Sequence, residues 1–261
     1  MTSPLWVAKT GLDAQQMRMS VISNNLANVS TTGYKRSRAA FEDLMYQNVR
    51  QTGAQSSQNT QLPSGLMLGT GVRTASTAKL FTQGNIIQTG NNLDLAINGR
   101  GFFEIQMPDG TSAYTRDGSF QLNDQGQIVT ANGYLLQPAT TLPTGVQSVS
   151  VSRDGVISAQ LAGQTTTTQI GTLQIVDFIN PAGLQAVGQN LFVQSSASGD
   201  PQPGNADANG LGSIMQGALE TSNVNVVEEM VDMIETQRAY EMNSKAIATT
   251  DQMLQYTNQN L

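Results

Sequence analysis

The chain has no cysteine and no histidine among its 261 residues, and these two absences exclude several kinds of site. Without Cys and His there is no disulfide, no thiol redox chemistry and no zinc site of the usual nitrogen and sulfur type. A Ser-His or Cys-His nucleophile pair and an imidazole proton shuttle are excluded as well. Catalysis by two carboxylates, as in glycosidases, stays open on composition alone.

Charge is also scarce, since 12% of the residues are charged against about 25% in an average protein. The net charge of −6 and the pI near 4.6 argue against nucleic acid as a partner. No run of about 18 apolar residues could span a membrane. The first residues lack a basic region followed by an apolar one, so we expect no cleavable signal peptide. A surface poor in charge but rich in neutral polar groups favours contacts with other protein.

Residues 3–29 show a helical pattern with a narrow apolar stripe. Ser3 followed by Pro4 is a good helix start, and Gly33 follows the predicted end. A second, interleaved heptad set, which includes Ile22, gives an a/d pattern with one polar interruption. The first heptad set consists of Leu5, Leu12, Met19 and Leu26.

Residues 225–258 repeat this design, and Asn225 with Glu228 resembles a capping box. Residues 1–50 carry a net charge of +3 and residues 217–261 carry −5, so we expect the two helices to pair. The alternative is two separate amphipathic helices lying on a globular core. The heptad positions of this second helix are Val226, Met233, Tyr240, Ile247 and Leu254.

The middle of the chain predicts β-structure, because short alternating runs are separated by pairs such as Asp109-Gly110 and Asp154-Gly155. The predicted fold class is α+β, with terminal helices paired as a coiled-coil-like core domain and a mainly-β domain inserted between them. The predicted domains are 1–46 with 213–261 for helical assembly, 47–71 as an extended linker, 72–205 as the β-rich domain and 206–212 as a return linker.

No constellation of residues predicts an enzyme. Asp109, Asp117 and Asp154 each precede glycine, which turn formation explains. The two short Gly-x-Gly segments are too short for a phosphate loop, and the Asp-x-Asp spacing of a calcium loop is missing. The basic cluster 35–38, Lys-Arg-Ser-Arg, favours a solvated turn over an anion site. We therefore expect no catalytic residue, no cofactor and no metal.

The terminal helices then become the informative part of the chain. A two-helix pair with a narrow apolar stripe is marginal in water, and its methionines suit adaptable packing. Copies of the same chain are the natural cover for the remaining apolar faces. Identical subunits that make head-to-tail contacts form rings or open helical filaments.

Four motifs resemble the flagellar rod and hook axial proteins of bacteria, nearly from end to end of the chain. Residues 25–35 read Asn-Leu-Ala-Asn-Val-Ser-Thr-Thr-Gly-Tyr-Lys and are similar to the N-terminal signature of that family. Residues 94–103, Asp-Leu-Ala-Ile-Asn-Gly-Arg-Gly-Phe-Phe, and 114–120, Tyr-Thr-Arg-Asp-Gly-Ser-Phe, resemble its central motifs. Residues 222–241 resemble its C-terminal helix.

Within this family the chain most resembles the members of the distal rod, on the opening residues 5–16 and on an insertion at 47–71. The insertion resembles the segment that distinguishes the distal rod from the shorter and flexible hook. We expect it to stiffen the rod by bracing neighbouring subunits. The residues predicted for this role are Gln47, Gly53, Ser56, Leu62, Pro63, Gly65 and Leu68.

The resemblance implies a non-enzymatic subunit of a helical tube that crosses the periplasm as a drive shaft in the flagellar basal body. The implied partners are further copies of the chain, proximal rod proteins, the hook protein, ring proteins of the cell wall and outer membrane, and the type III export apparatus. Two alternatives stay open. They are a β-rich module that binds cell-wall glycan on a helical stalk, and a wall hydrolase that uses two carboxylates.

Overall fold

A computed structural model describes residues 3–51, 55–57, 60–61, 64–143, 145–163 and 166–259. The chain forms two compact units. Unit 1 comprises Met1–Ala27, Ser37–Ala78 and Asn225–Leu261, and unit 2 comprises Asn28–Arg36 and Lys79–Val224. The chain therefore passes between the units at four places. The domain boundaries proposed from the sequence stay a prediction.

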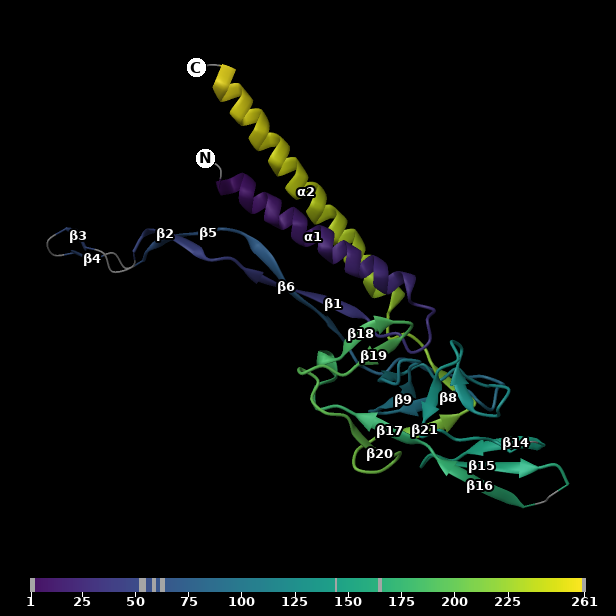
Figure 1. Ribbon diagram of the computed structural model, residues 1–261. Coiled ribbons are helices and arrows are strands. Elements are labelled where there is room, and N and C mark those ends of the chain that lie inside the picture. The colour runs from purple at the N-terminus through teal and green to yellow at the C-terminus, as the bar shows by residue number, and fades with distance from the viewer. Residues whose placement is uncertain are drawn as a thin grey trace. The chain divides into compact units, whose positions relative to one another are not determined.

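Unit 1 contains the two long helices, α1 (Ser3–Ala27) and α2 (Val226–Gln259), which lie side by side in Figure 1. Both predicted terminal helices are confirmed. The Asn225 side-chain oxygen accepts a hydrogen bond from the Val227 N–H at 3.1 Å, which caps α2 as the sequence predicts. Glu228 and Glu229 follow in the first turn, where the helix dipole favours negative charge. Neither helix, over its described residues, has a stretch apolar enough to cross a membrane.

Unit 1 also contains three pairs of strands between residues 37 and 79. The first pair joins β1 (Ser37–Asp43) to β6 (Val72–Lys79), of which the last residue belongs to unit 2. Next along the chain, β2 (Tyr46–Arg50) pairs with β5 (Leu66–Gly69), and β3 (Gln55–Ser57) pairs with β4 (Thr60–Gln61). The sequence predicts β-structure only from residue 72 onward. Strands β1 to β5 were missed because β1 to β4 are mostly polar and β5 is a short apolar run, so none of them shows a clear alternation of apolar and polar residues.

The β1–β6 pair is attached to α1 at two points. The Asn25 side chain accepts a hydrogen bond from the Ser37 N–H and donates one to the Ser37 carbonyl, both at 2.9 Å. At the other end of the ribbon, the Val72 N–H donates to the Thr10 hydroxyl at 3.3 Å. Gly71 permits this approach, because a Cβ there would lie 2.2 Å from the Thr10 hydroxyl oxygen.

The main sheet of unit 2 contains nine of the described strands, in the path β11-β12-β13-β9-β10-β19-β18, with β17 between β9 and β20. Every pairing in it is antiparallel. The strands are β9 (Phe102–Gln106), β10 (Ser112–Thr115), β11 (Phe120–Leu122), β12 (Ile128–Thr130), β13 (Leu135–Gln137), β17 (Gln174–Asp177), β18 (Gln185–Gly188), β19 (Leu191–Val193) and β20 (Gln202–Asn205).

The remaining strands of unit 2 bring the last part of the unit back to its beginning. Strand β7 (Ile86–Gln88) pairs with β22 (Ala218–Glu220), and β8 (Leu95–Asn98) pairs with β21 (Ser213–Gln216). A separate sheet joins β14 (Val146–Val151), β15 (Val156–Leu161) and β16 (Thr167–Thr172), and a 3-10 helix η1 spans Pro181–Gly183. The Asp154-Gly155 pair separates two strands as the sequence predicts, and these strands form a hairpin with Val151 opposite Ile157.

The core of unit 2 is apolar. Phe103, Ile105 and Ile175 are fully buried in the larger of two clusters of hydrophobic side chains. The predicted turn role of Asp109 is confirmed, since its carboxylate accepts hydrogen bonds from the Thr111 N–H and hydroxyl. Burial and turn chemistry thus agree with the central β-rich region that the sequence predicts.

Candidate assembly surface

The seam between α1 and α2 is polar and antiparallel. Arg18 forms an ion pair with Asp232 at 3.2 Å, and the Asn25 amide donates to both carboxylate oxygens of Glu229 at 3.2 Å. Nearer the start of α1, a Cβ on Gly11 would lie 3.2 Å from the Asn243 side chain. Gly11, Arg18 and Asn25 are seven residues apart, so the contacts follow a heptad.

The apolar heptad positions predicted for assembly lie beside this polar seam. In α1, Ile22 is buried, and Leu5, Leu12, Met19 and Leu26 are half-buried.

In α2, Met233 and Ile247 are half-buried, Val226 and Tyr240 are each 39% exposed, and the Leu254 side chain lies outside the described residues. Their role in self-assembly stays a prediction.

A larger set of apolar side chains on the two helices is open to solvent. Trp6 is 56% exposed and Val227 is 70% exposed, although residues of this kind are usually buried. Large exposed apolar surfaces mark sites of contact with protein or membrane. The exposed apolar residues of the two helices, which we call the helix apolar surface, are Trp6, Met17, Val226, Val227, Met230, Val231, Ile234, Tyr240, Met242, Met253 and Tyr256.

The predicted stiffening segment carries a second exposed apolar set. Gln47 and Leu68 lie opposite each other in the β2–β5 pair. The side chains of Leu66, Met67 and Leu68 are about half exposed, and Met45 is more so. A two-stranded ribbon with apolar side chains in water is marginal without further cover. Of the other predicted positions, Gly65 is half-buried and precedes β5, Ser56 lies in β3, and Gly53, Leu62 and Pro63 lie outside the described residues.

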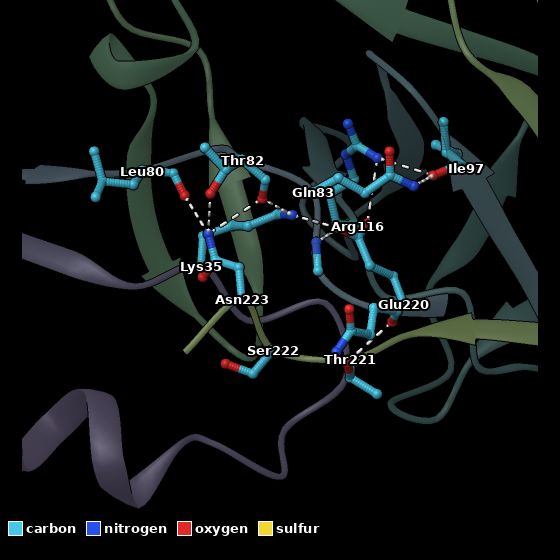
Figure 2. A network of polar contacts seen from close by, with 12 residues as sticks. Lys35, Leu80, Thr82, Gln83, Ile97, Arg116, Glu220, Thr221, Ser222 and Asn223 are labelled. Carbon is cyan, nitrogen blue, oxygen red and sulfur yellow. Dashed lines mark hydrogen bonds and ion pairs between the residues drawn. The ribbon is translucent and has the colours of Figure 1, made fainter. Parts of the chain in front are cut away.

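A buried charge cluster in unit 2 overturns the expectation of a solvated turn for Lys35, the first residue of the basic run 35–38. Lys35 is 1% exposed, and its ammonium lies 2.5 Å from a carboxylate oxygen of Glu220. Arg116 lies 3.3 Å from the other oxygen of Glu220 (Figure 2). The sequence carried one signal for this cluster. Strand alternation puts Glu220 on the same face as the buried Ala218.

Burial changes the acid–base behaviour of this cluster. Desolvation lowers the pKa of Lys35 below its usual range, and the attraction of Glu220 opposes this effect. Desolvation likewise lowers the pKa of Arg116, again against the attraction of Glu220. Two cations therefore share one carboxylate in a site that water does not reach. Among the described residues no group of carboxylates is placed to hold a metal ion.

Comparison with known proteins identifies the family. Three family models match: "Flagella basal body rod protein" at residues 5–35, "Flagellar hook protein FlgE/F/G D1 domain" at 96–159 and "Flagellar basal body rod FlgEFG protein C-terminal" at 215–260. The chain is 56% identical to the flagellar basal-body rod protein FlgG of Buchnera aphidicola subsp. Schizaphis graminum, over 99% of this chain and 100% of the relative. It is 46% identical to FlgG of Agrobacterium fabrum, over 98% of both chains.

These matches confirm the predicted resemblance and the prediction of a structural rod protein that is not an enzyme. They give no support to a glycan-binding module or a wall hydrolase. The chain therefore belongs to the family of flagellar basal-body rod proteins named FlgG.

Proposed function

We propose that the chain assembles with copies of itself into a rigid helical tube, the drive shaft of the distal rod, which transmits motor torque across the periplasm to the hook. Within the tube, the terminal helices form a coiled-coil-like inner layer. The further partners are proximal rod proteins, the hook protein, ring proteins of the cell wall and outer membrane, and the type III export apparatus.

The observation that carries this proposal is the division of the helices into a polar seam and an exposed helix apolar surface. The side chains of Arg18, Asn25 and Glu229 form their polar contacts within one chain. Val227, Met230 and Ile234 leave about half or more of their surface exposed. Full burial of an exposed side chain of this kind stabilises by about 1.5–3 kcal/mol, and covering the part that is still exposed contributes the corresponding share. Copies of the same chain, each with the same surface, provide that burial.

The β2–β5 pair suits the role of a brace between neighbouring subunits. Its residues are exposed, and Leu66, Met67 and Leu68 supply apolar contact area at one strand. A paired strand resists bending more than an extended linker, because its backbone groups are hydrogen-bonded to a partner. We therefore propose that the segment 47–71 stiffens the tube by contact with a neighbouring copy.

Electron microscopy of the purified chain at high concentration tests both parts of the proposal. We expect straight tubes of uniform diameter from the full chain, and curved tubes from a chain that lacks residues 47–71. A control variant that keeps the length but replaces Leu66, Met67 and Leu68 by serine separates apolar contact from length. Absence of any ordered assembly contradicts the tube. Equally straight tubes after the deletion contradict the brace.

A further inference from the structure

Unit 2 is joined to the rest of the chain at four places, which follow Ala27, Arg36, Ala78 and Val224. Any force that reaches this unit through the backbone must enter at one of these places. The residues of unit 2 next to three of them belong to three segments, 33–36, 79–84 and 220–224. We call these three segments the chain junction.

The side chain of Asn223 bonds to the other two segments of the chain junction at once. Its oxygen accepts a hydrogen bond from the Arg36 N–H at 2.7 Å. Its amide donates to the Leu80 carbonyl at 2.8 Å, and to the Thr82 carbonyl and hydroxyl at 3.1 and 2.9 Å. One neutral side chain therefore connects all three segments of the chain junction. Figure 2 shows Asn223 with Leu80 and Thr82.

Glu220 makes the second set of crosslinks, and it does so from a fully buried position. Its carboxylate accepts from the Lys35 ammonium at 2.5 Å and from the Gly84 N–H at 2.8 Å, and it pairs with Arg116. Its backbone carbonyl accepts from the Gly33 N–H at 2.8 Å. Charge-assisted hydrogen bonds of this kind are stronger than neutral ones, and more so where water is excluded.

Backbone contacts close the chain junction tightly. The Leu80 N–H donates to the Arg36 carbonyl at 2.9 Å, and the Thr221 N–H donates to the Asn85 carbonyl at 2.8 Å. A Cβ on Gly84 would lie 2.0 Å from the Thr221 carbonyl oxygen, so no larger residue fits there without movement. The fourth place of connection is close by, since Asn28 lines a cavity of about 180 Å³ together with Lys35 and Lys79.

We propose that Glu220 and Asn223 act as a clasp that holds the entering and leaving segments of unit 2 together, so that force on any one of them is shared by all three. The inference rests on the proposed function in one respect, namely that the rod carries torque. Along the chain, segments 79–84 and 220–224 lie between the unit boundaries and the strands of the main sheet. A pull on either segment therefore meets the bonds of the clasp before it reaches those strands.

Amide hydrogen exchange of the full-length chain in dilute solution tests the clasp. The variant Asn223→Ala removes four hydrogen bonds and leaves no buried charge. The matched control is Gln216→Ala, which also removes three hydrogen bonds of a side-chain amide in unit 2, to Asn92, Val149 and Val151. Gln216 touches none of the chain junction segments through these bonds.

We expect Asn223→Ala to raise the exchange rate about tenfold at the amides of Gly33, Leu80 and Gly84. The loss of the net stabilisation of one to two hydrogen bonds makes local opening more frequent by about this factor. The amides of Phe103 and Ile105 in the main sheet keep their protection. Gln216→Ala raises exchange near Val151 and leaves the junction protected.

Three results overturn the clasp: an equal rise at the junction and at the main sheet, no rise at the junction, or the same rise in the control. If Asn223→Ala fails to fold while Gln216→Ala folds, the variant Asn223→Asp replaces it. This carboxylate keeps an acceptor for the Arg36 N–H but cannot donate to Leu80 or Thr82. We then expect faster exchange at Leu80 than in the parent chain, and unchanged exchange at Leu80 overturns the clasp. The exchange data need no assembly, so tube formation by the same samples reports on the proposed function separately.

Discussion

The two units differ in the kind of side chains that they bury. In unit 2 the buried set is dominated by large apolar side chains such as Phe103, Ile105 and Ile175. In unit 1 the buried apolar side chains, among the described residues, are Ala14 and Ile22. The buried polar residues of that unit are more numerous, namely Asn25, Glu229 and Thr236.

The difference lies in how each unit obtains its apolar burial. Burial of apolar surface is the main favourable term in folding, and unit 2 obtains it from its own strands. Unit 1 leaves many of its large apolar side chains exposed and forms polar contacts between its two helices. Polar seams fix register, while the apolar faces beside them supply the free energy of association. Substitutions that change one unit and leave the other unchanged test this difference between the units.

The largest effect is expected from Phe103→Ala. This side chain is fully buried and packs edge-to-face against Phe120 at 5.2 Å between ring centroids. We expect a loss of about 4 kcal/mol in the free energy of unfolding, because transfer and cavity terms add. Urea unfolding of the dilute chain measures it. The control Trp6→Ala removes an exposed aromatic from α1, and a loss as large as that of Phe103→Ala would contradict the division between the units.

Glu220→Gln is expected to lower the free energy of unfolding by about 3 kcal/mol, because it removes the carboxylate that Lys35 and Arg116 share in a buried site. The matched control in unit 1 is Asp232→Asn. The ion pair of Asp232 with Arg18 has both side chains more than a third exposed, so we expect a loss below about 1 kcal/mol. Similar losses for the two variants, measured by urea unfolding in the same buffer, would remove the contrast between the units.

Lys35→Met is expected to have a smaller effect, and that effect depends on pH. The pKa of Lys35 in the folded chain lies below its ordinary value of 10.5. Between the lowered pKa and 10.5, the unfolded chain binds more protons, so the free energy of unfolding of the parent rises with pH. The variant lacks this contribution.

Urea unfolding of both chains from about pH 7 to about pH 10 should therefore show the parent gaining on the variant as pH rises. The Tyr114 phenol, whose pKa burial raises to about 12, acts in both chains alike and cancels in the difference. A difference between the two chains that stays constant with pH would contradict the assignment.

The smallest effect on the single chain is expected from Ile234→Ser. This side chain is 48% exposed on α2, so the free energy of unfolding should change by less than about 0.5 kcal/mol. Assembly at high concentration should nevertheless decrease, because the helix apolar surface is interrupted. Sedimentation measures the assembled fraction. The exposed polar position Gln237 gives the control Gln237→Ser, for which assembly should stay as in the parent.

The local features of the fold were predictable from the sequence. Heptads of apolar residues indicated α1 and α2, and Asp-Gly pairs indicated the hairpins of the central region. These signals work because each depends on residues within about one turn of helix or one hairpin. The function was predicted from the resemblance to a family, because the periodicity of apolar residues does not indicate a function.

The buried charge cluster could not be predicted in the same way. Lys35 stands in a basic run, which favours a solvated segment, and its partner Glu220 is 185 residues away. The pairing of β7 with β22 brings the carboxylate to the lysine, and the strand alternation at Glu220 does not indicate which distant cation it meets. The exposed strands β2 and β5 were missed for a related reason, since neither has a buried face that would impose alternation.

The two attachments of the β1–β6 ribbon to α1 amount to a length match. Thr10 and Asn25 are separated by fifteen residues, or about 22 Å of helix. Strand β1 covers a comparable distance of about 20 Å from Ser37 to Asp43. Two fixed points define a direction where one would allow the ribbon to swivel. The spacing of Thr10 and Asn25 on α1 thus matches the length of the ribbon. An inserted residue in β1 would move Gly71 away from Thr10 by about 3.3 Å.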